Sequence, residues 1–184
     1  MKPSVKVALI CSVISIGIML GFYCQGKSEL WFNKGALINL FLLVSSISVG
    51  VFLTRKKSNF NDTIFLDDFK VSMQGGIVFT LVISMFTYFY YSKIETNLLP
   101  NFRTEKMAEK KKLIPDEAAF LEMRKENVFY KDKTYMDFLE NEEDKGVLSM
   151  NTMIITIFHS FLGLLLTVFF SIFVTIILRK VVLR

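Results

Sequence analysis

The sequence predicts an all-α, polytopic membrane protein with four transmembrane helices and a helical extramembrane loop between the third and the fourth. All 22 Lys and Arg residues and all 17 Asp and Glu residues fall outside four long uncharged runs. Each run reaches the ~20 residues that a helix needs to cross the ~30 Å hydrocarbon core. A soluble core helix of this length would keep a polar face, so the pattern excludes a soluble domain. The runs are Val7–Gly26, Gly35–Thr54, Val71–Ser92 and Gly146–Leu178.

We therefore expect a single membrane domain over residues 1–184, with spans at about 5–25, 33–54, 70–92 and 151–178 and a loop at 93–149. The first run follows Lys2 and Lys6 and has two alternatives, a cleaved signal or a lipoprotein anchor at Cys24. It is longer than the usual signal core of about 7–15 residues, and no small-x-small site follows it. Tyr23 is also too large to precede an acylated Cys, so we expect a retained helix.

The distribution of basic residues orients the spans. Nine basic residues lie on the side of the two termini, against two in the loop between the first two spans. By the positive-inside rule, the termini are cytoplasmic and residues 93–149 periplasmic. The long loop complicates the count, because it holds eleven basic and thirteen acidic residues. The nine are Lys2, Lys6, Arg55, Lys56, Lys57, Lys70, Arg179, Lys180 and Arg184.

Aromatic residues mark the opposite interface. Tyr23 closes the first span and Trp31 opens the second, while a group of tyrosines, Tyr88, Tyr90 and Tyr91, closes the third. Four spans bring all of these to one side of the membrane, where amphipathic rings are enriched.

The loop has the signals of two short helices. Pro115-Asp116-Glu117 is typical of a helix start, and Thr134-x-x-Asp137 resembles a capping box. Gly146 predicts a break before the last span. Asp67 and Asp68 are placed to cap the third span.

Small residues predict how the spans pack, because helices in lipid associate through close backbone approach and short polar contacts. The first span contains the pair Gly17-x-x-x-Gly21. The third and fourth spans each carry a row of small residues at steps of four, which we expect at contacts within the chain or between copies. The rows are Ser72, Gly76, Thr80 and Ser84, and Gly163, Thr167, Ser171 and Thr175.

Three polar residues within the spans are candidate functional groups: Asn39, Gln74 and His159. His159 is the only histidine. An ionisable group in a membrane is a functional candidate, but a neutral imidazole bonded to a neighbouring helix is the simpler interpretation. The spans contain no carboxylate for a proton relay, which argues against a coupled carrier.

The sequence indicates no catalytic, cofactor or metal site, because none of the usual catalytic or phosphate-binding motifs occurs. The acidic segment Glu140–Asp144 lacks the spacing of a calcium loop and is more simply a solvated surface. The +5 net charge flanks apolar spans instead of forming a basic face, so no nucleic-acid partner is expected. The expected partners are the lipid bilayer and another membrane protein or a second copy.

The order of these features resembles the bacterial membrane family called domain of unknown function 4199. The resemblance covers nearly the full length and rests on three segments: Phe65 to Gly76 with its Asp-Asp pair, Tyr88 to Ile94, and Ser160 to Lys180. It implies a four-helix protein of a bacterial inner membrane, and it brings no activity or catalytic residues.

The leading hypothesis is a non-enzymatic assembly, scaffold or regulatory component. The alternative is an oligomeric small channel or carrier, in which Asn39, Gln74 and His159 converge on a hydrated path. An enzyme that uses loop residues ranks last, since only the acidic residues of the loop favour it.

The orientation is testable with a topology reporter inserted at Glu122, in the middle of the long loop. We expect a reporter that works only in the periplasm to be active there, because the basic residues beside the termini hold that side in the cytoplasm. A reporter active only in the cytoplasm would reverse the orientation.

Overall fold

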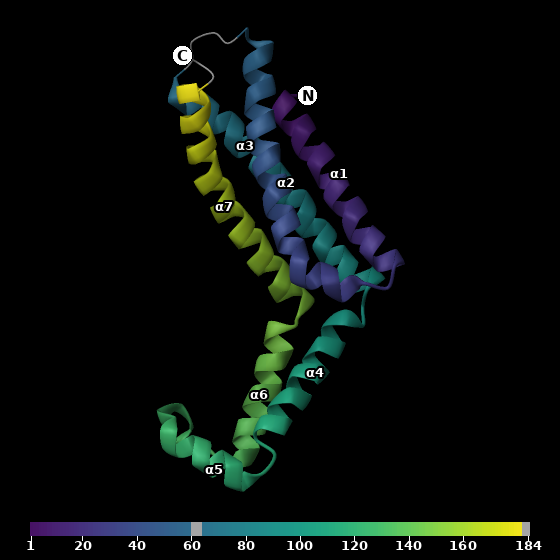
Figure 1. The fold of residues 1–184 in the computed structure, drawn as a ribbon, viewed down its shortest axis with the longest axis vertical. Helices are drawn as coiled ribbons and strands as arrows, with labels where there is room; N and C mark the ends of the chain where they lie inside the picture. Colours follow the sequence, from purple (N-terminus) through teal and green to yellow (C-terminus); the bar gives the residue numbers. More distant parts are fainter. Residues whose placement is uncertain (60–63, 182–184) are drawn as a thin grey trace. The chain divides into compact units, whose positions relative to one another are not determined.

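The computed structural model describes residues 1–59 and 64–181. All secondary-structure elements in this part of the chain are helices (Figure 1). Four of its helices are long and apolar enough to cross a membrane, which confirms the predicted fold class. Arg184 and part of the connector that leads to the third span lie outside the described residues. The α-helices are α1 (Pro3–Cys24), α2 (Ser28–Lys57), α3 (Phe65–Phe89), α4 (Leu98–Leu113), α5 (Glu117–Glu126), α6 (Tyr135–Ser149) and α7 (Thr152–Val181).

The chain forms two compact units. The first, here called the bundle, consists of Met1–Tyr90 and Thr156–Arg184 and contains the four apolar helices α1, α2, α3 and α7. The second, the loop unit, is Tyr91–Ile155 and contains α4, α5 and α6. The loop unit is inserted in the chain between α3 and α7. The prediction of one membrane domain over the whole chain stays a prediction.

Within the bundle, α1, α2 and α3 pack against one another, and the four helices run alternately up and down (Figure 1). Pro3 occupies the first turn of α1, where its missing N–H is not needed. Gly26 has a φ of +66° and makes the tight turn into α2. That backbone conformation favours glycine, because a Cβ would be strained there.

The second and third bundle helices extend at both ends beyond the uncharged runs that predict them. α2 starts at Ser28 and takes in Arg55, Lys56 and Lys57 in its last turn. These cations suit the negative end of the helix dipole, so the helix continues where the uncharged run stops. α3 likewise begins at Phe65, and a turn of π-helix, Tyr90–Ile94, continues it.

The loop unit has three α-helices where the sequence predicts two. Both predicted starts are confirmed. Asp116 caps α5 by accepting from the backbone N–H of Ala119 at 2.9 Å, and Thr134 and Asp137 form a reciprocal capping box on α6. Helix α4 was not predicted, because its composition is dominated by charges and Pro100 lies in its first turn. A proline is compatible with a first turn, since the N–H groups there have no partner within the helix.

The predicted break at Gly146 is wrong. Helix α6 passes through Gly146 and ends at Ser149, and Asn151 starts α7 by accepting from the N–H of Met153 at 2.8 Å. One glycine inside a helix costs only about 1 kcal/mol, which the rest of α6 offsets. Arg103 packs beside this position, with its Cγ 3.4 Å from where a Cβ would stand.

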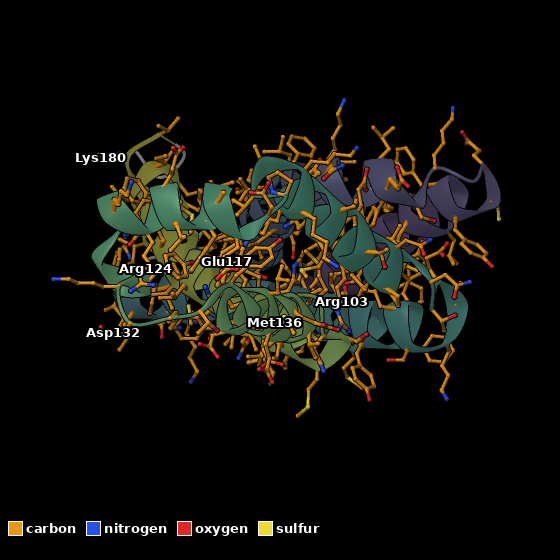
Figure 2. The ribbon with its side chains drawn as sticks, turned by 90° about the horizontal axis from the view of Figure 1, so that it is seen from below. Arg103, Glu117, Arg124, Asp132, Met136 and Lys180 are labelled. Atoms are coloured by element: carbon orange, nitrogen blue, oxygen red, sulfur yellow. The ribbon has the colours of Figure 1, made fainter. Side chains whose placement is uncertain are left out.

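Aromatic rings form the core of the loop unit. Phe120 of α5 and Phe138 of α6 are buried, with their ring centroids 5.3 Å apart. Tyr130 meets Phe138 edge-on at 5.5 Å, and the hydroxyl of Tyr135 donates to the carbonyl oxygens of Ile114 and Pro115. These contacts join α5 and α6 to the end of α4. Figure 2 views the side chains from below, with Arg103 of α4, Arg124 of α5 and Met136 of α6 labelled.

The capping box also sets the charge state of Asp137. The backbone N–H and the hydroxyl of Thr134 hydrogen-bond to its carboxylate and lower the pKa of Asp137 below its ordinary value. The contribution of this carboxylate to α6 is therefore complete above the ordinary pKa of an aspartate. It is lost as the pH falls through the lowered value.

Candidate functional site

An ionic contact joins three helices at one end of the bundle. Asp68, in the first turn of α3, accepts from Nη2 of Arg55 on α2 at 2.5 Å and from Nη1 of Arg179 on α7 at 3.3 Å. The side chains of Arg55 and Asp68 are only 7% and 6% exposed, whereas Arg179 is 32% exposed. We call these three residues the Asp68 clamp. Lys2, the N-cap residue of α1, donates to Gln74 of α3 at 3.3 Å.

Sequence reasoning assigned Asp68 to capping alone and did not predict the clamp. The cap residue of α3 is Ile64, which makes no side-chain cap hydrogen bond, and Asp68 is turned to the arginines instead. The only signal in the sequence is that basic residues end the second and fourth spans while an acidic pair begins the third.

The small-residue rows of α3 and α7 face each other. A Cβ built on Gly76 would collide with the methyl group of Thr167, and a Cβ on Gly163 would lie 2.7 Å from that of Thr80. Each glycine thus accommodates a threonine of the opposite helix. The hydroxyl oxygens of Thr80 and Thr167 are 3.4 Å apart, and Thr167 also donates to the carbonyl of Gly163 at 2.8 Å.

At one end of the rows, Ser72 and Thr175 are 3.1 Å apart through their hydroxyl oxygens, and both are buried. Ser84 and Ser171 are buried as well, but their hydroxyl groups have no hydrogen-bond partner among the described residues. The two rows therefore lie along one contact, the close approach that substitutes for hydrophobic burial in lipid.

The glycine pair of α1 lies elsewhere. Gly17 is exposed, and neither Gly17 nor Gly21 has an atom of another residue within 4 Å of a Cβ position. A role for this pair in contacts between copies stays a prediction.

Helix α1 packs through serines instead, a face that sequence reasoning missed. Ser4, Ser12 and Ser15 are buried and share one side of α1 with Ala8, a spacing that is visible in the sequence. The Cα of Ser4 lies 3.0 Å from where a Cβ of Gly50 on α2 would stand. The serine face therefore gives α1 its close approach.

Aromatic side chains gather at the other end of the bundle. The hydroxyl of Tyr90 donates to Ser28 at 3.1 Å, and the ring of Tyr90 meets that of Tyr23 edge-on at 6.1 Å. Trp31 lies against Phe22, with ring centroids 6.0 Å apart. The ends of α1, α2 and α3 thus meet as the aromatic pattern predicts.

Two of the three polar candidates line one cavity. A cavity of about 250 Å³ lies between α2, α3 and α7, and both Asn39 and His159 border it. Asn39 also accepts a hydrogen bond from Ser15 of α1 at 2.5 Å. Gln74 does not border the cavity and bonds to Lys2 instead.

The acidic segment of the loop unit is engaged in ion pairs. Glu142 is buried and pairs with Lys110 of α4 and, at 2.6 Å, with Lys145. Glu143 pairs with Arg103 at 3.0 Å. These pairs hold α4 beside α6. Over residues 1–59 and 64–181, no three His, Cys, Asp or Glu side chains are grouped to hold a metal ion.

Four long apolar helices, joined by small-residue and ionic contacts, define a multi-pass α-helical membrane protein. The chain belongs to the family described as protein of unknown function (DUF4199), whose family model matches residues 6–180. The resemblance seen in the sequence is thereby confirmed. Neither a search of curated proteins nor a search of solved structures finds a match to this chain.

The clamp predicts a strong effect of Asp68→Asn. The substitution removes the charge between two arginines, one of them buried, and we expect it to lower the free energy of unfolding by about 3 kcal/mol. Unfolding of the purified protein in mixed micelles measures the change. Asp67→Asn is the matched control, because Asp67 is the exposed neighbour in the same turn. Equal effects of the two substitutions would contradict the clamp.

The facing rows predict that Gly76→Val destabilises the bundle and Gly17→Val does not. At Gly76 the new side chain meets Thr167, and overpacking of this kind costs about 1–3 kcal/mol. At Gly17 there is open space, so we expect a change within about 0.5 kcal/mol. The same unfolding measurement distinguishes the two. A further Thr167→Ala substitution should restore part of the loss, and a fully stable Gly76→Val protein would refute the contact.

Proposed function

We propose that this protein is a non-enzymatic assembly component of a bacterial inner membrane, in which the bundle anchors the loop unit for contact with a partner protein or a second copy. One observation carries the proposal. Most polar groups inside the bundle are engaged in contacts that hold its helices together. The contacts are those of Asp68 with two arginines, Ser72 with Thr175, Thr80 with Thr167, Ser15 with Asn39 and Lys2 with Gln74.

The loop unit is the part suited to contact a partner. It has its own aromatic core and ion pairs, yet it leaves large apolar side chains in the open. Phe129 is 88% exposed and Met136 is 74% exposed. Phe and Met are among the residue types that are enriched in protein interfaces.

The proposed orientation has the termini in the cytoplasm and the loop unit in the periplasm. The clamp brings Arg55 and Arg179 to the same end of the bundle, and both belong to the basic group that the positive-inside rule places in the cytoplasm. A homo-oligomer through α1 would use the exposed side of that helix, where Gly17 has room for another backbone.

The alternative of an oligomeric channel or carrier receives less support. It requires Asn39, Gln74 and His159 to converge on one hydrated path. Asn39 and His159 border one cavity, but Gln74 is bonded to Lys2, and most of the cavity lining is apolar.

The assembly role is testable by cross-linking in intact membranes followed by native mass measurement of the full chain in mild detergent. We expect a defined complex, and we expect Phe129→Ser to reduce its yield at least fivefold because Phe129 is the most exposed aromatic side chain of the loop unit. Lys131→Ser is the control in the same segment and should leave the yield unchanged. A strictly monomeric wild-type chain without a stoichiometric partner would refute the proposal.

A further inference from the structure

The cavity between α2, α3 and α7 has a composition that the assembly role does not explain. Its wall is formed mainly by apolar side chains, among them Leu43, Phe79 and Leu166. Polar groups enter it from three helices, as Asn39, Thr80 and His159. Its lining contains no Asp, Glu, Lys or Arg, so it suits a molecule without charge.

The polar groups of this cavity retain hydrogen-bonding capacity. The side-chain oxygen of Asn39 accepts from Ser15, which leaves the two amide N–H donors. The imidazole of His159 has no hydrogen-bond partner within the part of the chain that the structure describes. Inside a bilayer, no bulk water compensates a donor that lacks a partner, so an occupant with an acceptor would be favoured.

The depth of Asn39 and His159 in the bilayer limits which molecules can occupy the cavity. His159 comes seven residues after the start of α7 at Thr152, and Asn39 comes eight residues after Trp31. At 1.5 Å per residue these are distances of about 10 and 12 Å along the helices. If Thr152 and Trp31 mark the membrane boundary, an interfacial layer of about 5–7 Å on each side puts both groups at the depth of hydrocarbon. A phospholipid has its ester carbonyls in the interface and only methylene groups at this depth.

The cavity is large enough for a ring. An apolar cavity of about 150 Å³ already binds benzene. The volume here, about 250 Å³, therefore accommodates a substituted six-membered ring, and because the cavity is not fully enclosed, an apolar tail has space to leave it.

We propose that this cavity binds a neutral, lipid-soluble molecule with a carbonyl-bearing ring and an apolar tail, an isoprenoid quinone in chemical class. The amide of Asn39 and the imidazole of His159 donate to the ring carbonyls, while Phe79 and the leucines enclose the ring. The proposal concerns binding alone and includes no electron transfer.

Trp31 offers a direct test, because it is the only tryptophan in the sequence and comes shortly before Ala36, which lines the cavity. Its ring covers Gly35, the residue before Ala36 in the cavity wall. Quinones quench tryptophan fluorescence. The full-length protein in lipid nanodiscs is titrated with decylubiquinone, and we expect quenching with a saturable component.

Four variants test whether the saturable part of the quenching comes from binding in the cavity. His159→Leu and Asn39→Leu should each weaken the apparent affinity tenfold or more, because each removes a donor. His159→Gln keeps a donor and should stay within threefold of wild type. Phe158→Leu is the control on α7, since Phe158 is 65% exposed and does not line the cavity. A thermal-shift measurement separates binding from folding: decylubiquinone should raise the melting temperature of the wild type and not that of His159→Leu.

Two results would overturn the proposal. One is quenching that never saturates, or that is equal in wild type and His159→Leu, since a quinone dissolved in the bilayer alone gives that behaviour. The other is occupation by a phospholipid chain. In that case, a phospholipid with a nitroxide in mid-chain would quench Trp31 in a saturable way, and decylubiquinone would not relieve the quenching.

Discussion

Helices that meet within a bilayer gain nothing from removing apolar surface from water, because the lipid is as apolar as their side chains. Close approach of backbones and short polar contacts must therefore hold this bundle together. Gly76 and Gly163 each receive a threonine from the opposite helix, and the serine face of α1 lies against Gly50 of α2. Some large apolar residues pack inside the bundle, such as Leu43, Ile47 and Phe79, which are buried. Others are left to the lipid: Phe41 of α2 and Met85 of α3 are both more than 70% exposed.

The Asp68 clamp is a short polar contact of the same kind, but between charged groups. A carboxylate in the first turn of a helix is favoured by the helix dipole, and arginines in the last turns of α2 and α7 are favoured by theirs. Because α3 runs opposite to both helices, these three ends meet, and one aspartate joins them. The clamp also fixes the position of the helices along their axes. Small residues alone permit one helix to slide past another, whereas an ion pair between helix ends does not.

The functions proposed for this protein depend on which of its polar groups are occupied by contacts between helices. Most of those in the bundle are occupied by neighbouring helices, which supports an anchoring role. The imidazole of His159 differs, and so do the amide N–H donors of Asn39, because they border a cavity of about 250 Å³ among apolar side chains. The loop unit differs in another way, since its ion pairs bury Glu142 while Phe129 stays exposed. A bundle that binds a lipid-soluble molecule and anchors an exposed module would combine these two features.

The sequence by itself determined the elements with strong local signals. Charge-free runs longer than the hydrocarbon core specify membrane helices, and Asp116 and Thr134 specify helix starts through their own backbone hydrogen bonds. Helix α4 escaped prediction because charges mask its periodicity, and Gly146 misled because one glycine costs a helix little. Only the tertiary structure decided which small residues touch. The pair at Gly17 and the row at Gly76 look alike in the sequence, but whether a glycine meets another helix depends on the rotation of its own helix. The same holds for Asn39 and His159, which are 120 positions apart and come together only when α2 and α7 pack around α3.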